Sequence, residues 1–260
     1  MTYCLGIIST HGLVMAADSR TNAGVDYIST YRKMFDFSVP GDRTILLCTS
    51  GNLSITQSVM LSIEQDLRSL EAENLHSCHS MYDIACYLGQ KLRHVQARER
   101  EWLEKDRIDA SCNILLGGQV RGQATELYML YSQGNFIKAM PETPFLQIGE
   151  IKYGKPILDR MLTFDTSIED AVKCALLSFD STMKSNVSVG PPIDLIMYRN
   201  NSLEILHQRS LQRGDPYLLQ VRMEWESFLK TAFDRIPPID WEQSNELKLE
   251  HVDFSGFLNH

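Results

Sequence analysis

The chain has 260 residues, with 33 acidic and 25 basic side chains and a formal net charge of −8. Its length suits one large domain, or one domain with an extension, and its hydrophobic content of 43% is enough for a packed core. Nucleic acids and anionic membrane surfaces attract positive charge, so this acidic chain is expected to bind neither.

Targeting signals and disulfides are not expected either. The longest apolar runs, such as 45–48 and 193–198, are far shorter than the roughly 20 residues that cross a bilayer. The N-terminal residues lack the basic region of a secretory signal. The six cysteines are scattered through apolar runs, which is typical of reduced core thiols. We therefore expect a soluble cytoplasmic protein.

Short apolar runs separated by turn residues open the chain and predict strands. These runs cover residues 3–9, 13–17, 34–39 and 44–49. His11-Gly12 and Pro40-Gly41-Asp42 supply the turns of two hairpins. The spacing of apolar residues then changes to steps of three and four, which predicts amphipathic helices at 54–70 and 80–105, with Ser80 capping the second.

A second series of strands and helices follows in the same order. Strands are predicted at 112–116, 126–131, 136–139 and 145–148, helices at 153–162 and 167–183, and a last hairpin pairs 193–198 with 203–206. Because runs of strands alternate with pairs of helices, the order favours an α+β architecture of antiparallel sheets covered by helix pairs. It argues against a parallel βαβ sheet.

The predicted core domain covers residues 1–210, and residues 211–260 form a C-terminal extension. Asp215-Pro216 is a strong helix start. An apolar stripe that includes Trp225 continues from it, and Ile236-Pro237-Pro238 ends the helix. This stripe either packs on its own domain or contacts another subunit. We expect a subunit contact, because the segment lies beyond the predicted core.

The start of the chain carries the most informative chemical signal. An initiator methionine before a small residue is usually removed, and loss of Met1 would give Thr2 a free α-amine beside its hydroxyl. The amine has a reference pKa of about 7.7–8.0, so near neutral pH it can accept the hydroxyl proton and activate the nucleophile. On this feature alone, the simpler interpretation is that Thr2 merely begins a strand.

Two charged residues and a glycine strengthen the nucleophile hypothesis. Asp18 ends the second predicted strand and Lys33 precedes the third, so both could reach the first residue of the opening strand. A cation there would favour the neutral amine and the alkoxide, and a carboxylate would hold that cation. Gly51 joins a strand to a helix, where its N–H suits an oxyanion. Taken singly, these would be surface charges and a turn glycine.

Together these residues resemble the proteasome-type threonine peptidases, which are N-terminal-nucleophile hydrolases. The resemblance runs from Thr2 to about Leu206 and is carried by Thr2 and the segments 15–20, 31–35 and 49–51. Segments 147–158 and 188–194, with the C-terminal extension, are similar to the bacterial Anbu, or ancestral β-subunit, branch. The resemblance implies a four-layer αββα sandwich of two antiparallel sheets between helix pairs, in agreement with the predicted element order.

The resemblance also implies a role for each matching residue. Thr2 would be the nucleophile through its hydroxyl and the base through its amine. Lys33 would lower the pKa of that hydroxyl, Asp18 would orient Lys33, and the Gly51 amide would donate to the oxyanion. The positions that match the pocket for the residue before the scissile bond are Thr21, Thr49 and Leu53.

One region departs from the pattern of the family. Proteasome β subunits usually place a serine after the glycine that corresponds to Gly149, whereas this chain has Glu150. The acid and serine that support the amine in those subunits are not evident, since segment 185–188 offers Ser185 and Ser188 but no carboxylate. An anionic Glu150 near the amine would favour its protonated form and weaken it as a base.

The function that follows is a peptidase acting on peptides or unfolded proteins inside a homo-oligomeric ring or spiral, with no cofactor. No phosphate-binding loop of the Gly-rich Lys-Ser/Thr kind occurs, so any unfolding driven by ATP would need a separate ATPase. Two alternatives stay open. One is a weakly active or non-catalytic assembly or peptide-binding protein on the same fold, and the other is an amidase acting on small amides.

His76-Ser77-Cys78-His79 is the remaining candidate motif, as a metal site. It falls in the link between the first two predicted helices, and no second cluster of ligands stands at a suitable spacing. We therefore expect no metal.

Overall fold

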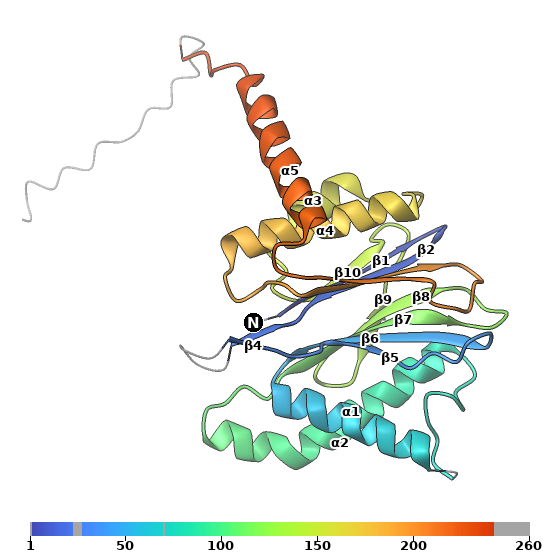
Figure 1. Ribbon diagram of the computed structural model, residues 1–260. Helices are drawn as coiled ribbons and strands as arrows, with labels where there is room; N and C mark the ends of the chain where they lie inside the picture. Colours follow the sequence, from blue (N-terminus) through green and yellow to red (C-terminus); the bar gives the residue numbers. More distant parts are fainter. Residues whose placement is uncertain (1, 23–27, 70, 242–260) are drawn as a thin grey trace, which may run out of the picture. The chain divides into compact units, whose positions relative to one another are not determined.

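The structure is a computed structural model that describes residues 2–22, 28–69 and 71–241. It divides into two compact units, Met1–Met223 and Glu224–His260. The first unit contains two five-stranded antiparallel sheets that lie face to face, with a pair of helices outside each (Figure 1). The predicted α+β fold, a four-layer αββα sandwich, is confirmed.

The first sheet has the order β10-β1-β2-β11-β12. Its strands are β1 (Tyr3–Ser9), β2 (Gly12–Asp18), β10 (Phe145–Gly149), β11 (Ile193–Arg199) and β12 (His207–Leu211). Cys4 pairs with Ala17 of β2, and Tyr3 pairs with Gly149 of β10. The start of β1 therefore lies between the end of β2 and the end of β10, where Asp18 and Gly149 stand.

The second sheet has the order β5-β6-β7-β8-β9, and β3 and β4 form a separate two-stranded sheet. The strands are β3 (Arg20–Asn22), β4 (Ile28–Thr30), β5 (Met34–Asp36), β6 (Arg43–Gly51), β7 (Cys112–Val120), β8 (Glu126–Leu130) and β9 (Phe136–Lys138). For residues 21, 22, 28 and 29, the structure describes the backbone but not the side chains.

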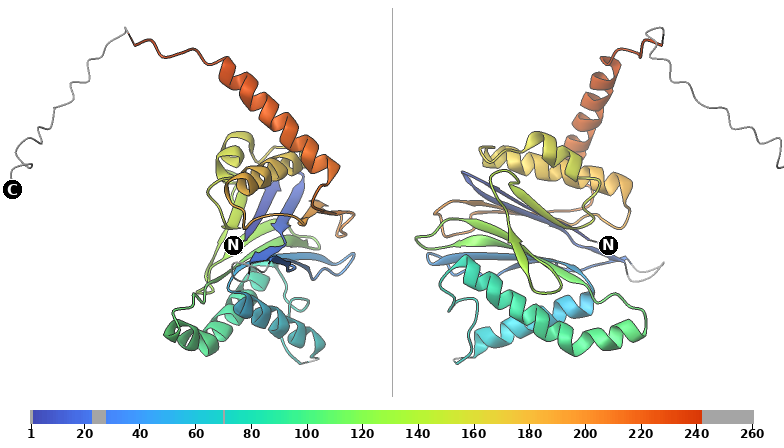
Figure 2. Two further views of the ribbon diagram at one scale, coloured as in Figure 1. Left: turned by 60° about the vertical axis from the view of Figure 1, so that its left-hand side comes forward. Right: turned by 180° about the vertical axis from the view of Figure 1, so that it is seen from behind.

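Each sheet is covered by two helices on its outer face (Figures 1 and 2). Those on the second sheet are α1 (Leu53–Arg68) and α2 (Met81–Lys105), and those on the first are α3 (Lys155–Met161) and α4 (Ile168–Ser185). The predicted cap of α2 is confirmed, because the Asp83 N–H donates to Ser80 Oγ at 3.1 Å. None of the helices among the described residues is both long and apolar enough to cross a bilayer.

The core consists of three apolar layers, one between the sheets and one between each sheet and its helices. In β1, Cys4 enters the layer between the sheets, whereas Tyr3 and Leu5 enter the layer beneath α4. Both faces of the strand are therefore buried. This explains why β1 is a continuous apolar run in the sequence rather than an alternating one.

Tyr3 fastens the start of β1 to the helix layer. Its hydroxyl shares a hydrogen bond of 2.6 Å with Ser178 Oγ of α4 and accepts another of 2.5 Å from Gln147 Nε2 of β10. Its ring centroid lies 4.5 Å from that of Phe179. Burial raises the pKa of the Tyr3 phenol well above its ordinary value. The residue after Thr2 is thus held by polar and apolar contacts together.

Two details of the strand prediction need correction. The last strand is β12 at His207–Leu211, and the predicted strand at 203–206 is wrong. Asn201 and Leu203 have φ angles of +64° and +48°, so the chain turns in this region instead of extending. Only Leu211 is buried in β12, which explains why the strand gave no apolar signal. The three-residue strands β3 and β4 were also not predicted, because they are too short to show a period.

The helix predicted after Asp215 is present as α5 (Pro216–Asp234). The Asp215 carboxylate caps it by accepting the Tyr217 N–H at 2.9 Å. Leu218 and Val221 are partly buried and pack against the layer beneath α4. The first turns of α5 therefore belong to the same compact unit as the sandwich, which runs to Met223.

Asp66 connects α1 to α2 at the edge of the outer layer. The Tyr87 hydroxyl donates to Asp66 Oδ2 at 2.7 Å, and Lys91 forms an ion pair with the same oxygen. Burial by itself would raise the pKa of Asp66, but these contacts with Lys91 and Tyr87 outweigh it and hold the pKa below its ordinary 3.8. The ionised carboxylate therefore stabilises the folded state.

Replacing Asp66 by asparagine should lower the free energy of unfolding by about 1 kcal/mol at pH 7. A depressed carboxyl pKa stabilises the fold above the unfolded value of 3.8, and this contribution disappears as the pH falls through the folded value. Urea unfolding of wild type and Asp66→Asn at pH 7 and pH 3 measures the difference. An equal loss at both pH values would contradict the assignment.

Candidate active site

Lys33 and Asp18 form an ion pair that is shielded from solvent. Lys33 Nζ lies 2.7 Å from Asp18 Oδ1, and the two side chains are 5% and 0% exposed. Lys33 Nζ also donates to the Arg20 carbonyl oxygen at 2.7 Å. Such additional hydrogen bonds are needed to offset the desolvation of a buried pair. An ammonium group has three N–H donors, so these two bonds leave one for a further partner.

Asp18 also accepts two backbone N–H groups. The Tyr3 N–H donates to Oδ1 at 2.9 Å and the Gly190 N–H to Oδ2 at 3.3 Å. Burial raises the pKa of the Asp18 carboxyl, and the Lys33 ammonium and these two N–H groups act in the opposite direction. The carboxylate thereby joins the start of β1, the Lys33 side chain and the loop before β11.

The backbone of Lys33 is fixed as well. Lys33 immediately precedes β5, and its carbonyl oxygen accepts the Thr49 N–H of β6 at 2.9 Å. The antiparallel pairing of β5 with β6 thus brings Lys33 next to the end of β6. Lys33 and Asp18, which are 15 residues apart, meet because β2 and β5 belong to the two sheets that face each other.

A pocket of 440 Å³ opens at the start of β1. Its volume falls within the 300–1,000 Å³ that is usual for ligand sites. The residues that line it are Thr2, Tyr31, Lys33, Thr49, Ser50, Gly51, Leu53, Thr56, Asp109 and Gly149. The structure therefore brings together five residues that the sequence analysis singled out, namely Thr2, Lys33, Thr49, Gly51 and Leu53. Asp18 lies behind Lys33.

Gly51 occupies a position that only glycine fits. Its φ is +112°, and an added Cβ would lie 2.2 Å from the Ser111 carbonyl oxygen. The next residue, Asn52, caps α1 by accepting the N–H groups of Ser54 and Ile55 at 2.9 and 3.3 Å. The glycine thus presents backbone at the pocket wall where β6 ends and α1 begins. Its role as an oxyanion donor stays a prediction.

Glu150 follows β10, which pairs with β1 on the side opposite β2, and it lies beside Thr2. The Glu150 N–H donates to the Thr2 carbonyl oxygen at 2.7 Å. Gly149 has a φ of +85°, and an added Cβ there would lie 2.0 Å from the same oxygen. Glu150 is 8% exposed, and its Oε2 accepts a hydrogen bond from Asn186 Nδ2 at 2.9 Å. The residue whose backbone bonds to Thr2 therefore carries a buried carboxylate with an amide partner.

The two serines near Glu150 in the sequence analysis occupy different places. Ser185 is the last residue of α4, is exposed and lines another hollow. The Ser188 N–H donates to Asn186 Oδ1 at 2.9 Å. Asn186, which the sequence analysis did not select, lies in the same segment and contacts Glu150. The roles of both serines stay predictions.

Other pocket residues were not selected from the sequence. Thr56 follows Leu53 by three residues on α1, so helical spacing alone could have placed both on one face. Tyr31 lies in segment 31–35, which carried the resemblance but gave Tyr31 no role, and Asp109 comes from a loop and gave no local signal. The side chain of Thr21, predicted to shape the pocket, lies outside the described residues.

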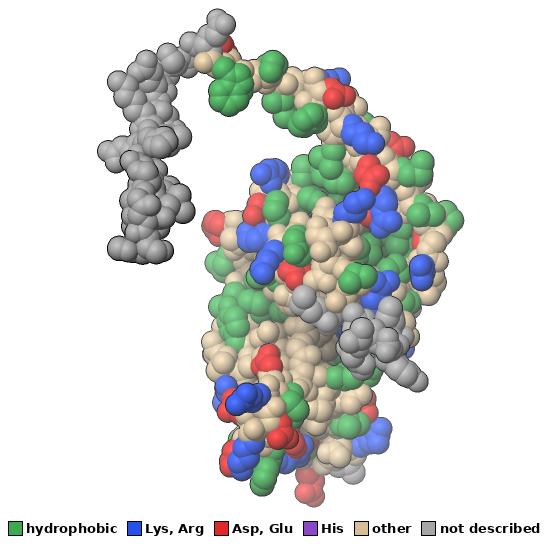
Figure 3. Space-filling view, turned by 90° about the vertical axis from the view of Figure 1, so that its left-hand side faces the viewer, with side chains coloured by type: hydrophobic (Ala, Val, Ile, Leu, Met, Phe, Trp, Pro, Cys, Tyr) green, Lys and Arg blue, Asp and Glu red, His purple; other side chains and the backbone are tan. Residues whose placement is uncertain are grey.

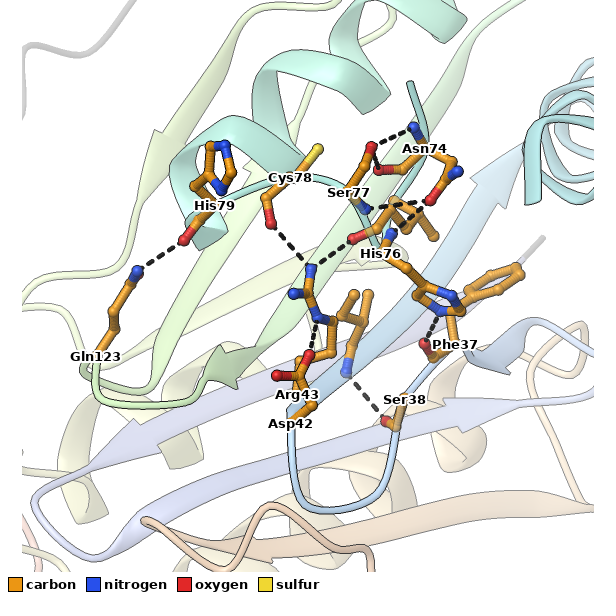
Figure 4. Close-up of polar contacts among 12 residues, drawn as sticks. Phe37, Ser38, Asp42, Arg43, Asn74, His76, Ser77, Cys78, His79 and Gln123 are labelled. Atoms are coloured by element: carbon orange, nitrogen blue, oxygen red, sulfur yellow. Dashed lines mark hydrogen bonds and ion pairs between the residues drawn. The ribbon is translucent and has the colours of Figure 1, made fainter. Parts of the chain in front are cut away.

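The His76–His79 segment does not converge on a common point (Figure 4). His76 Nε2 is bonded to the Phe37 carbonyl oxygen at 2.9 Å, and the ring of His79 and the thiol of Cys78 point in other directions. Arg43 Nη1 instead binds the carbonyl oxygens of Leu75 and Cys78 at 3.1 and 2.9 Å. Within the described ranges, no three His, Cys, Asp or Glu residues form a group that could hold a metal.

Comparisons with known proteins identify the family. A model of the proteasome subunit family matches residues 2–197. Comparison with curated protein sequences gives no match. Among solved structures, an Anbu (ancestral beta-subunit) from Yersinia bercovieri is 42% identical, with a TM-score of 0.86 over 92% of this chain and 99% of that one.

Two further solved structures are also similar to this chain. One, described as a helical assembly of the Anbu complex from Pseudomonas aeruginosa, is 44% identical, with a TM-score of 0.88 over 93% of this chain and 100% of that one. A Gly-1 mutant of Anbu from Hyphomicrobium sp. strain MC1 is 38% identical, with a TM-score of 0.86 over 92% and 100%. The chain therefore belongs to the proteasome family of N-terminal-nucleophile hydrolase folds and, within it, to the Anbu proteins.

Proposed function

We propose that the chain is a threonine endopeptidase that hydrolyses peptide bonds of peptides or unfolded proteins within a homo-oligomer. Thr2 is the nucleophile, and its α-amine becomes the base once Met1 is removed. The observation that carries this proposal is the buried Lys33–Asp18 pair at a pocket wall that Thr2 also lines. A cytoplasmic location, and a separate ATPase if substrates need unfolding, belong to the same proposal.

The reaction follows from the groups at the pocket. The Thr2 hydroxyl oxygen attacks the carbonyl carbon of the scissile bond while its proton passes to the α-amine. The third N–H of Lys33 favours the alkoxide as it forms, and the Gly51 N–H donates to the tetrahedral oxyanion. Collapse expels the amine product, which takes the proton, and leaves an ester on Thr2. Water, activated by the same α-amine, then hydrolyses the ester.

Asp18 contributes by holding Lys33. The carboxylate fixes the ammonium at 2.7 Å and is itself fixed by the Tyr3 N–H of the adjacent residue in β1. Nucleophile and cation therefore share one anchor, and their separation does not depend on a flexible loop. Such preorganisation is the main way in which an active site lowers the activation free energy.

The first test is the state of the N-terminus. Intact-mass measurement of the purified protein should show the loss of one methionine residue. A peptide epoxyketone, which closes a ring with both the hydroxyl and the amine of an N-terminal threonine, should then add once per chain at Thr2. Retained Met1, or an adduct at another residue, would overturn the proposed mechanism.

The homo-oligomer is supported by the composition of α5 and the residues after it. No residue of α5 is buried. Large apolar side chains are exposed along the described part of this segment, including Phe228, Phe233, Ile236 and Trp241. Exposed apolar surface of this extent is typical of interaction sites. One of the related structures is described as a helical assembly, and we propose that residues 224–260 hold neighbouring copies together in this protein.

Deleting residues 224–260 should reduce the oligomer to smaller species without unfolding the first unit, because the packed residues of α5, Leu218 and Val221, are retained. Light scattering measures the mass, and circular dichroism checks the fold. Phe228→Ser/Phe233→Ser should have the same effect in the full chain, whereas Leu61→Ser/Tyr82→Ser, at exposed positions of α1 and α2, should not. An unchanged mass after deletion would show that the contact lies elsewhere.

Replacing Glu150 by glutamine should move the acidic limb of the pH profile of kcat/KM to lower pH, by about 1 pH unit. An anionic neighbour raises the pKa of the Thr2 amine, and the amine acts as base only when neutral. Its pKa should therefore fall when the charge is removed, while the amide oxygen can still accept Asn186 Nδ2. Asn186→Ala, which keeps the charge, is the matched control. An unchanged pH profile would show that the charge of Glu150 does not act on the pKa of the Thr2 amine.

A further inference from the structure

The buried part of the pocket at Thr2 is polar. Thr49, Ser50 and Thr56 line the pocket, and each of them is 3% or 4% exposed. The Thr56 hydroxyl donates to the Leu53 carbonyl oxygen at 2.9 Å, so its oxygen can still accept a hydrogen bond. Among the described residues, nothing forms a hydrogen bond with the hydroxyls of Thr49 and Ser50. A buried polar group without a partner costs free energy, so this lining favours a ligand that brings hydrogen-bonding groups with it.

Asp109 brings a carboxylate to the same pocket. The Asn52 side-chain amide donates to the Asp109 carbonyl oxygen at 2.9 Å, which ties the loop before β7 to the residue after Gly51. The carboxylate is held by Ser111, whose N–H donates to Asp109 Oδ1 at 2.9 Å and whose hydroxyl donates to Oδ2 at 2.7 Å. A carboxylate has about four acceptor sites, so it can still bind a ligand through the others.

The Asp109 carboxylate is ionised near neutral pH. The two hydrogen bonds from Ser111 lower the pKa of Asp109 below its ordinary 3.8 and outweigh the effect of burial. Asp109 is exposed, so solvent reaches the charge and limits the strength of an ion pair there. The end of the sandwich at which β1 begins carries both acidic and basic side chains (Figure 3). The charge at the pocket therefore depends on the residues that line it rather than on a surrounding field of one sign.

Two cations near this carboxylate are already paired with other acids. Lys33 is the other charged residue of the described lining, and the buried Asp18 carboxylate neutralises it at 2.7 Å. Arg100 also lowers the pKa of Asp109, but its Nε lies 2.6 Å from Glu104 Oε1. Among these five side chains, two positive and three negative charges leave one negative charge, that of Asp109. The described lining therefore attracts a cation.

The side chains of lysine and arginine match this lining. Each has an apolar stem and N–H donors at its end. Leu53 and Tyr31 line the pocket and offer nonpolar surface to the stem, while the hydroxyl oxygens and the Asp109 carboxylate accept the N–H groups. An acidic side chain would be repelled by Asp109, and an aliphatic or aromatic one would leave the buried hydroxyls unpaired. The Thr2 amine does not oppose a cation, because it is neutral in the form that acts as base.

We propose that Asp109 determines the specificity of this site, and that the preferred peptides carry arginine or lysine at the residue before the scissile bond. The preference in hydrolysis rests on the proposed function, because it needs Thr2 to react at this pocket. The preference in binding does not. Asp109 contacts the side chain of the substrate and none of the reacting atoms, so its replacement changes which peptide is cleaved rather than whether the ester forms.

The first test compares fluorogenic peptides, acetyl-Ala-Ala-X-aminomethylcoumarin, in which X is arginine, lysine, leucine or glutamate. In wild type, kcat/KM should be highest for arginine and lysine and lowest for glutamate. Asp109→Asn keeps an oxygen for the Ser111 N–H and should lower the ratio of arginine to leucine about fivefold, the upper range for an ion pair that solvent reaches. Asp109→Lys should place glutamate above arginine. Asp106→Asn, at an exposed position of the same loop outside the pocket lining, is the matched control and should keep the wild-type ratio.

The second test measures binding without hydrolysis. Thr2→Ala cannot form the ester, and in this variant fluorescein-labelled Ala-Ala-Arg amide should bind about fivefold more tightly than the Ala-Ala-Leu amide. Fluorescence anisotropy measures both dissociation constants. The difference should disappear in Thr2→Ala/Asp109→Asn. Equal binding of the two peptides in Thr2→Ala, or no saturable binding of either, would overturn the proposed specificity.

The two tests distinguish a failure of the specificity from a failure of the peptidase function. If the peptidase function fails, no variant hydrolyses any of the peptides, while the preference in anisotropy remains. If wild type and Asp109→Asn hydrolyse the peptides with the same ratio of arginine to leucine, the specificity assigned to Asp109 is wrong and the peptidase function stands.

Discussion

Thr2→Ala should reduce peptide hydrolysis by at least about three orders of magnitude. The substitution removes the hydroxyl that forms the ester, and no other hydroxyl in the pocket belongs to a residue with an α-amine next to it. Thr49, Ser50 and Thr56 also line the pocket, but each lies inside the chain and lacks that base. The measurement is kcat/KM for a fluorogenic peptide, with the mass of the N-terminus checked in each preparation.

Thr2→Ser is the matched variant. It keeps the hydroxyl and, after removal of Met1, the amine, so it should hydrolyse the peptide at a measurable rate and form the same covalent adduct. Loss of activity in both variants with full removal of Met1 would show that the methyl group or the local packing, rather than the hydroxyl, matters. Activity of Thr2→Ala at the wild-type level would assign the hydrolysis to another residue.

Lys33→Met should have the second large effect, on stability and catalysis together. It leaves the Asp18 carboxylate buried without its ammonium, and its remaining partners among the described residues are the Tyr3 and Gly190 N–H groups. Breaking a buried pair in this way costs about 3–5 kcal/mol of the free energy of unfolding. The third N–H of Lys33 is lost at the same time, so kcat/KM should fall by about 100-fold or more.

A double variant separates the two effects. Lys33→Met/Asp18→Asn removes both charges and keeps a side-chain oxygen that can accept the Tyr3 N–H. Urea unfolding should show that most of the lost stability returns, whereas kcat/KM should stay as low as in Lys33→Met. Recovery of both quantities would mean that Lys33 acts only through the fold. Recovery of neither would mean that Lys33 supports the fold through more than the ion pair.

The layers of this fold were predictable because their segments are long and apolar. The sequence of β1 is a continuous apolar run, which predicts a buried strand. The sequence of α2 has a helical period over 25 residues, which predicts a helix. β12 did not, because a single buried residue gives no period, and the positive φ at Asn201 and Leu203 depends on the surrounding structure. Local sequence predicts an element well when the element buries a regular face, and poorly when it lies at an edge.

The site divides in the same way. Thr2, Lys33 and Gly51 stand in short segments that together carried the resemblance to a known family, although each residue alone favoured a purely structural interpretation. The contact between Glu150 and Asn186 joins residues 36 positions apart, and it depends on how the end of α4 meets the end of β10. Neither the sequence around Glu150 nor the sequence around Asn186 indicates that the two residues meet. The same holds for the Gly190 N–H on Asp18, which comes from 172 residues further along the chain.

The anchoring of Tyr3 has a consequence for Thr2, the proposed nucleophile. The ends of a polypeptide usually fray, because few contacts restrain the last residues. Here Tyr3, the residue after Thr2, is held between α4 and β10 by its contacts with Ser178, Gln147 and Phe179. The backbone on the C-terminal side of Thr2 is therefore fixed by folding, and the Glu150 N–H also holds the Thr2 carbonyl oxygen at 2.7 Å. If Thr2 is the nucleophile, as proposed, a catalytic cycle needs no preceding disorder-to-order step at this position.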